Sequence, residues 1–258
     1  MRHRLLSLSC IVVIAAVSAS CAEPPERDVE LAKSKSEAAR AAGAAQYAPA
    51  AMDALAAAQS ALDAEMTAQS SKWLKSFDKA SSLAVAVQQA ADKAATEAAA
   101  TRERLLTAAR SGVGVTLGPN VFQNGDFANG TTEWFANPAS DATVNVMPAE
   151  GARAWHVTYR KGNWAVINQE QELKPDTIYV YEGWVKTTAP VVSFYWQSDI
   201  GRFFETDKTY PTWTRVRNVI VTPHWNGRPY RVSFCPLLMQ GAGEAWLRDL
   251  RISEVLNR

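Results

Sequence analysis

The segment SGVGVTLGP at residues 111–119 divides the sequence into two parts of different composition. Alanine dominates the part before it, whereas all tryptophans except Trp73 follow it, together with frequent glycine, proline and asparagine. The segment itself is rich in glycine and ends in proline, which favours a turn over a regular helix or strand. The sequence therefore predicts a helical domain over 28–112, a linker over 113–117 and a β-sheet domain over 118–258.

Upstream of the junction, apolar residues recur at the spacing of α-helices over 51–66 and 73–91, and a further helix is expected over 28–45. Because alanine buries little area per residue, such helices must pack closely to stay folded. The pattern predicts an antiparallel helical hairpin or three-helix bundle, with Trp73 and Phe77 in its core.

The helical half also carries a resemblance. The segment AAGAAQYAP at 41–49, followed by alanine-spaced helices, resembles an alanine-rich helical domain of unknown function found on bacterial lipoproteins. The resemblance covers about 25–105 and implies a location but no activity. Two interpretations of the helices are open. They form a spacer or an oligomerising coiled coil, or they form a self-contained bundle. The apolar stripes of these helices lack the flanking charge pairs typical of coiled coils. Association of several chains through the helices stays open as an alternative.

The first twenty residues have the order of a secretion signal, with arginines before an apolar run at 5–17. The segment SASC at 18–21 resembles the lipobox of bacterial lipoproteins, although its first serine stands where an aliphatic residue is usual. The resemblance implies cleavage of a signal peptide over 1–20, lipid attachment to Cys21 and an anchored linker over 21–27. Ordinary cleavage after Ala19 is the alternative.

The residue after the cysteine bears on location. Ala22 stands where many lipoproteins retained at the inner membrane have an aspartate, which favours the outer membrane. We therefore expect a lipid-anchored protein of the cell envelope.

Downstream of the junction, short runs rich in β-branched and aromatic residues alternate with turn residues. Their spacing predicts an antiparallel β-sandwich, and about 140 residues suffice for one buried core. The runs are 142–146, 154–159, 164–173, 179–186, 191–197, 214–221, 230–235 and 246–252.

Three stretches of this half, in order, resemble the jelly-roll carbohydrate-binding modules of families 4 and 9. They are NVFQNGDF at 120–127, QEQELKPDT at 169–177 and GAGEAWLRDLRI at 241–252. The resemblance implies a galactose-binding-like jelly roll that binds carbohydrate. Such modules often hold a structural calcium ion, but Ala128 and Arg248 replace two of the usual carboxylates. We therefore expect no metal, although Asp126 and Asp249 remain.

Sugar binding requires flat aromatic side chains flanked by hydrogen-bonding groups. Along 179–186 the period of two places Glu182 and Trp184 on one face and Tyr179, Tyr181 and Val185 on the other. The same rule directs two side chains of 191–197 outward, and the resemblance directs one glutamine of 169–177 at the ligand. The predicted ligand-binding residues are Gln169, Glu182, Trp184, Tyr195 and Gln197. We assign Trp134, Trp155, Trp213 and Trp246 to packing, and Trp164 and Trp225 are weaker candidates for exposed rings.

Catalysis is not expected. Glu170 and Glu172 are spaced like the carboxylates of an inverting glycosidase, but neighbours on one strand face cannot flank a bond from opposite sides. No catalytic triad or phosphate loop accompanies them. The formal charge of +1 gives no field that would collect nucleic acid. Two functions remain: a carbohydrate-binding lipoprotein, or a structural or protein-interaction lipoprotein that binds no sugar.

Overall fold

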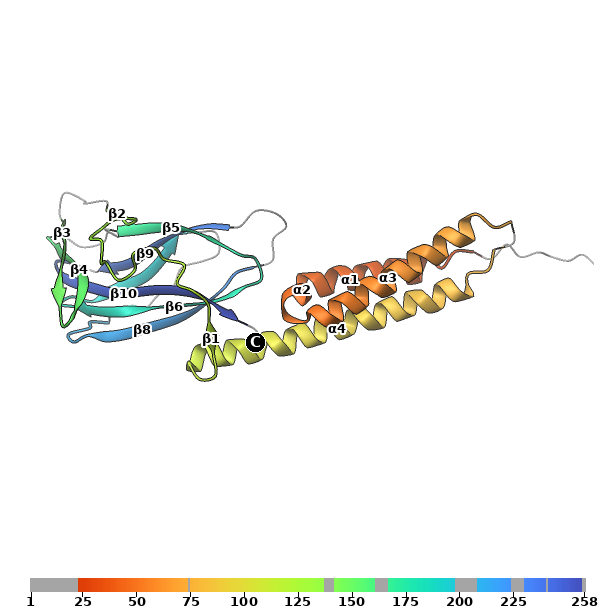
Figure 1. Ribbon diagram of the computed structural model, residues 1–258, viewed down its shortest axis with the longest axis horizontal. Coiled ribbons are helices and arrows are strands. Elements are labelled where there is room, and N and C mark those ends of the chain that lie inside the picture. The colour runs from red at the N-terminus through yellow and green to blue at the C-terminus, as the bar shows by residue number, and fades with distance from the viewer. Residues whose placement is uncertain are drawn as a thin grey trace, which may run out of the picture.

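The computed structural model describes residues 23–73, 75–136, 142–160, 167–197, 208–223, 230–239 and 241–256. It consists of a helical bundle followed by an antiparallel β-sandwich (Figure 1), which confirms the predicted fold class.

The bundle is built around one long helix. The helices are α1 (Glu26–Ala41), α2 (Ala44–Tyr47), α3 (Pro49–Ser70) and α4 (Asp78–Ser111). Both α1 and α3 pack along α4, and α3 runs antiparallel to it. At 1.5 Å per residue the 34 residues of α4 span about 50 Å, so its C-terminal end extends beyond the other helices to the sandwich (Figure 1). Among the described residues, no helix combines the length and the apolar character needed to cross a membrane.

Small side chains fill the bundle core, as the sequence predicts. Ala39, Leu55, Ala84 and Val87 are fully buried, and Phe77 is buried where α4 begins. Trp73 is not: its side chain is 97% exposed, so its assignment to the core is wrong. It lies in the turn between α3 and α4, which is at the end of the bundle opposite the sandwich (Figure 1).

Two sheets form the sandwich. The first is six-stranded, with the order β3-β4-β10-β6-β8 and β1 paired to β10; the second has the order β2-β5-β9-β7. The strands are β1 (Thr116–Leu117), β2 (Phe135–Ala136), β3 (Ala142–Ala149), β4 (Ala152–Tyr159), β5 (Ile167–Leu173), β6 (Ile178–Thr187), β7 (Val191–Gln197), β8 (Thr214–Val221), β9 (Tyr230–Met239) and β10 (Gly243–Leu256). Because β1 pairs with β10, the end of the predicted linker belongs to the sheet.

Aromatic residues dominate the core between the sheets. Trp134 and Trp155 are buried there, as predicted, and Phe122 packs against Trp134 and Phe234 at ring-centroid distances of 5.3 and 5.2 Å. The face of β6 that carries Tyr179, Tyr181 and Val185 points into this core, which confirms the alternation predicted for that strand.

The bundle and the sandwich share a second apolar cluster. Ile178, Val180 and Val255, on the outer face of the six-stranded sheet, belong to the same buried cluster as Leu105 and Leu106 of α4. Polar contacts border this joint. The hydroxyl of Tyr47 donates a hydrogen bond to the carbonyl oxygen of Asp176, in the turn between β5 and β6. The helices therefore cover part of the sheet rather than only linking it to the N-terminus.

Raising the pH above 10 is expected to weaken this joint through Tyr47. Burial, assisted by the nearby Asp176 and Glu254, raises the pKa of the phenol to about 12, against the opposing effect of Arg102. The neutral phenol is thus favoured in the folded state. Its contribution is complete below pH 10, where the unfolded chain also keeps the proton, and is lost as the pH rises towards 12. The loss is up to about 2 kcal/mol.

Urea unfolding at pH 9 and pH 11.5 measures this effect. The wild type should lose more stability between the two pH values than Tyr47→Phe, which has no phenol to ionise. Equal losses in the two proteins would contradict the assignment.

Candidate functional site

The outer face of the six-stranded sheet carries an aromatic surface at the end farther from the helices. On β6, Trp184 and Lys186 share the face of Ile178 and Val180. On β10, Trp246 pairs with Lys186 and with His156 of β4, and Arg248 pairs with Trp184. We call Trp184, Lys186, Trp213, Trp246, His156 and Arg248 the aromatic face.

An arginine joins two of the tryptophans on this face. The guanidinium carbon of Arg248 lies 4.5 Å from the ring centroid of Trp213 and 5.6 Å from that of Trp184. Its Nη1 donates to the carbonyl oxygens of Ala149 and Glu150, both at 3.3 Å, in the β3–β4 turn. Such cation–π contacts fix the rings in place while leaving Trp184 partly exposed.

Trp246 forms the second part of the aromatic face. The His156 ring stacks on it at 4.7 Å with an interplanar angle of 6°, and Lys186 Nζ lies 5.3 Å from its centroid. His156 Nε2 lies 3.3 Å from a carboxylate oxygen of Glu244. The face thus combines flat rings with charged and hydrogen-bonding groups, which is the chemistry that recognises sugar rings.

Trp213 and Trp246 are absent from the residues that the sequence predicts for binding. Both were expected to pack in the core or at its edge, but neither belongs to the sandwich core. The sequence contains a signal for Trp246, because its neighbours Ala245 and Leu247 are apolar and belong to the opposite face of the strand. The structure buries both neighbours.

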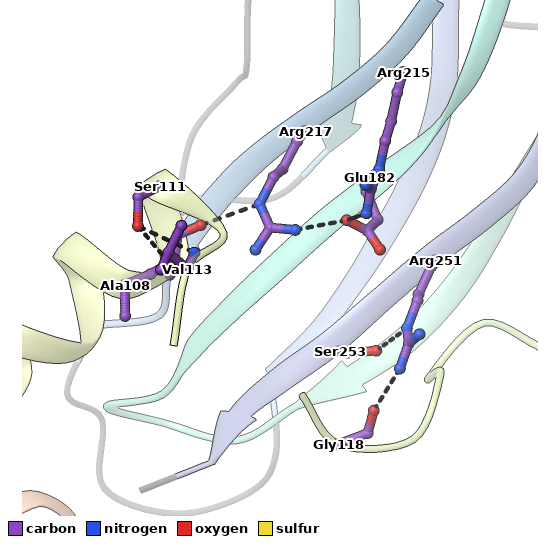
Figure 2. Close-up of polar contacts among 10 residues, drawn as sticks. Ala108, Ser111, Val113, Gly118, Glu182, Arg215, Arg217, Arg251 and Ser253 are labelled. Atoms are coloured by element: carbon purple, nitrogen blue, oxygen red, sulfur yellow. Dashed lines mark hydrogen bonds and ion pairs between the residues drawn. The ribbon is translucent and has the colours of Figure 1, made fainter. Parts of the chain in front are cut away.

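Glu182 lies on the same side of the sheet as Trp184 but nearer the helices. It is 8% exposed, and one carboxylate oxygen accepts hydrogen bonds from Arg215 at 2.7 Å and Arg217 at 2.8 Å. Arg217 Nε also donates to the carbonyl oxygen of Ala109 near the end of α4, at 3.1 Å (Figure 2). Through Arg217, Glu182 therefore takes part in the contact between the sandwich and α4.

Gln169 lies on the other sheet and faces inward. It is 6% exposed; its amide nitrogen donates to the carbonyl oxygens of Gln123 and Glu133, and its amide oxygen accepts from the backbone nitrogen of Gln123. The expected position on a ligand face is therefore wrong. The side chain instead satisfies buried backbone groups of the loop before β2.

Tyr195 and Gln197 do not neighbour Trp184. They belong to β7, which pairs with β9, whereas β6 pairs with β8 and β10. The predicted ligand-binding residues therefore come from both sheets, because the chain crosses from one sheet to the other between β6 and β7. The side chains of Tyr195 and Gln197, like all of Trp164 and Trp225, lie outside the described part of the structure.

The outer face of the four-stranded sheet has a different character. Arg231 of β9 lies 3.5 Å from a carboxylate oxygen of Glu170 and 3.9 Å from one of Glu172. Phe135, 64% exposed, lines a hollow of about 380 Å³ with Glu133, Asn168, Gln169 and Glu170. Both glutamates point to solvent from one strand, so they do not flank a common substrate position.

The two aspartates that could still contribute to a calcium site line the same hollow. Asp126 and Asp249 line one hollow with Asn120 and Arg251. Arg248 Nε also lies 3.8 Å from Asp249 Oδ2. Cationic groups thus stand where a calcium ion needs oxygen ligands, so these residues do not fit the ion. Within the described ranges, no three His, Cys, Asp or Glu residues form a group that could hold a metal.

Comparison with known proteins agrees with the jelly roll. A family model described as a carbohydrate binding domain, CBM_4_9, matches residues 119–234 and confirms the resemblance of this half. A search of the curated proteins found no significant match.

Several solved structures are similar to about half of this chain. A family 16 carbohydrate binding module is 21% identical, with a TM-score of 0.35, over 52% of this chain and 99% of that one. TmCBM61 in complex with β-1,4-galactotriose is 16% identical, with a TM-score of 0.39, over 52% and 98%. The CBM22-1 xylan-binding domain of Paenibacillus barcinonensis Xyn10C is 13% identical, with a TM-score of 0.34, over 50% and 89%. The ligands named here are those of the other proteins.

Proposed function

We propose that this chain is a lipid-anchored protein of the cell envelope, held at the outer membrane, whose sandwich binds a carbohydrate without catalysis. The match of a carbohydrate binding domain to residues 119–234 carries the proposal for the sandwich. The lipobox-like segment before Cys21 supports the anchor.

The aromatic face is the proposed binding surface. Trp184 and Trp246 present partly exposed rings on a rigid sheet, and Lys186, His156 and Glu244 can hydrogen-bond hydroxyls beside them. A ring held in place before binding loses little conformational entropy when a sugar stacks on it. Glu182 and Gln169 support the surrounding structure in this proposal and do not contact the ligand.

Replacing Trp184 with alanine is expected to weaken polysaccharide binding by about 5- to 150-fold, equivalent to about 1–3 kcal/mol, because a stacking ring is lost. Titration of the soluble Cys21→Ser protein with a panel of polysaccharides measures the affinity, and a thermal melt shows whether the fold survives. Phe135→Ala, which removes an exposed ring from the other sheet, is the matched control.

The outcomes separate the two candidate functions. Loss of binding in Phe135→Ala but not in Trp184→Ala would move the site to the four-stranded sheet. If no polysaccharide binds the wild type, the chain is a structural or protein-interaction protein. Membrane fractionation of cells that carry Cys21→Ser tests the anchor separately, because release of the variant into the soluble fraction is expected.

A further inference from the structure

The tip of the helical bundle displays a tryptophan almost completely to solvent. Trp73 is 97% exposed, the highest value among the large hydrophobic residues of the described chain. Lys72 and Lys75, both exposed, flank it in the turn between α3 and α4. An indole in this setting leaves a large apolar ring surface in contact with water, beside two cationic side chains.

The turn that carries Trp73 is held by several contacts. The backbone nitrogen of Ser76 donates to Gln69 Oε1 at 3.2 Å, and Gln69 Nε2 donates to Glu65 Oε1 at 2.7 Å. Lys79 Nζ lies 2.6 Å from the other carboxylate oxygen of Glu65. These contacts join the start of α4 and Ser76 before it to the end of α3, and Trp73 projects into solvent.

The position of the turn relates it to the N-terminus. The bundle tip lies at the end opposite the sandwich (Figure 1). Gln88 Nε2 donates to the carbonyl oxygen of Asp28, so the start of α1 lies beside Gln88 of α4. Gln88 is ten residues after the first residue of α4, which places the start of α1 about 15 Å from the tip. The five residues from Cys21 to Glu26 can span about 17 Å. A lipid on Cys21 can therefore reach the level of Trp73.

We propose that Trp73, Lys72 and Lys75 form a second membrane contact that enters the interface of an anionic bilayer beside the lipid on Cys21. The proposal rests on the proposed anchoring. Tryptophan rings favour the boundary between headgroups and acyl chains, and lysines near an anionic surface add attraction. A lipid chain and a second contact together hold a protein more firmly than either alone.

The chemistry of the tip favours a lipid surface over a protein partner. One ring with exposed lysines and serines around it offers far less than the area of about 800 Å² per partner that a stable protein interface needs. With the tip in the interface, the 22 residues of α3 would keep the nearest part of the sandwich, the turn at Asp176 beside Tyr47, about 30 Å from the bilayer.

Brominated lipids can detect Trp73 at the interface. The protein over residues 21–258, with Cys235→Ser, is coupled through Cys21 to a maleimide lipid in vesicles of phosphatidylethanolamine and phosphatidylglycerol with brominated acyl chains. Wild-type fluorescence should be quenched more than that of the Trp73→Phe variant, because none of the other described tryptophans lies in the helical bundle. Equal quenching would overturn the proposal.

Charge reversal provides a second measurement on the Cys21→Ser protein, which has no lipid. Lys72→Glu with Lys75→Glu should lower its partition coefficient onto phosphatidylglycerol vesicles by at least about 30-fold, since each lysine near such a surface contributes a factor of about five. Lys33→Glu with Lys93→Glu, on the sides of the bundle, is the control. Equal losses in both pairs would also overturn the proposal.

Mass spectrometry of protein from the membrane fraction tests the lipid on Cys21 independently. A chain that lacks the lipid but whose Trp73 is quenched refutes the anchor and supports the membrane contact. A lipidated chain whose Trp73 is not quenched refutes only the contact.

Discussion

A fragment that begins at Val113 is expected to unfold at a much lower urea concentration than the full chain. Without the helices, Ile178, Val180 and Val255 lose the cover that keeps each of them less than 5% exposed. Burial of one such side chain stabilises a fold by about 1.5–3 kcal/mol, so the loss is on the order of 5 kcal/mol or more. That is comparable with the whole stability of many domains.

Proteases are still expected to cut near the junction, because Val113 is 76% exposed. The β-sheet fragment released by the cut should bind a hydrophobic dye and aggregate, because the helices no longer cover its apolar face. The matched control is the same fragment with Ile178→Thr and Val180→Thr, which should stay in solution longer. A fragment as stable as the full chain would show that the two domains fold independently, as their compositions alone suggest.

Replacing Glu182 with glutamine is expected to lower the free energy of unfolding by about 3 kcal/mol. Glu182 is the shared partner of Arg215 and Arg217, and the Arg217 side chain is only 20% exposed between the sheet and α4 (Figure 2). Removing one member of a buried ion pair costs about 3–5 kcal/mol because a charge stays buried without compensation. The partial exposure of Arg217 places the expected value at the lower end.

Glu170→Gln is the matched control for this measurement. Glu170 also pairs with an arginine, but at 3.5 Å and with both side chains more than 60% exposed, so about 0.5 kcal/mol or less is expected. Chemical denaturation of both variants gives the comparison. If Glu182→Gln is as mild as Glu170→Gln, Glu182 does not hold the joint and becomes available as a ligand-binding group again.

Local patterns in the sequence predicted most of the secondary structure and several burial assignments. The helical spacing over 51–66 and 73–91 corresponds to α3 and to α4 with the turn before it. The alternation along β6 separated Tyr179, Tyr181 and Val185 from Trp184 correctly. These features depend only on residues near one another in the sequence. The period of apolar residues determines which face of a helix or strand each side chain occupies.

The tertiary structure alone decided what lies against each face. It put β6 and β7 in different sheets, turned Gln169 inward against a loop, and linked Glu182 through Arg217 to the end of α4. It also left Trp73 uncovered at the tip of the bundle. A repeat of two or 3.6 residues separates the faces of a strand or helix, but the partner of each face comes from residues far away in the chain. Pairing and cover therefore depend on contacts between distant segments, which no local period records.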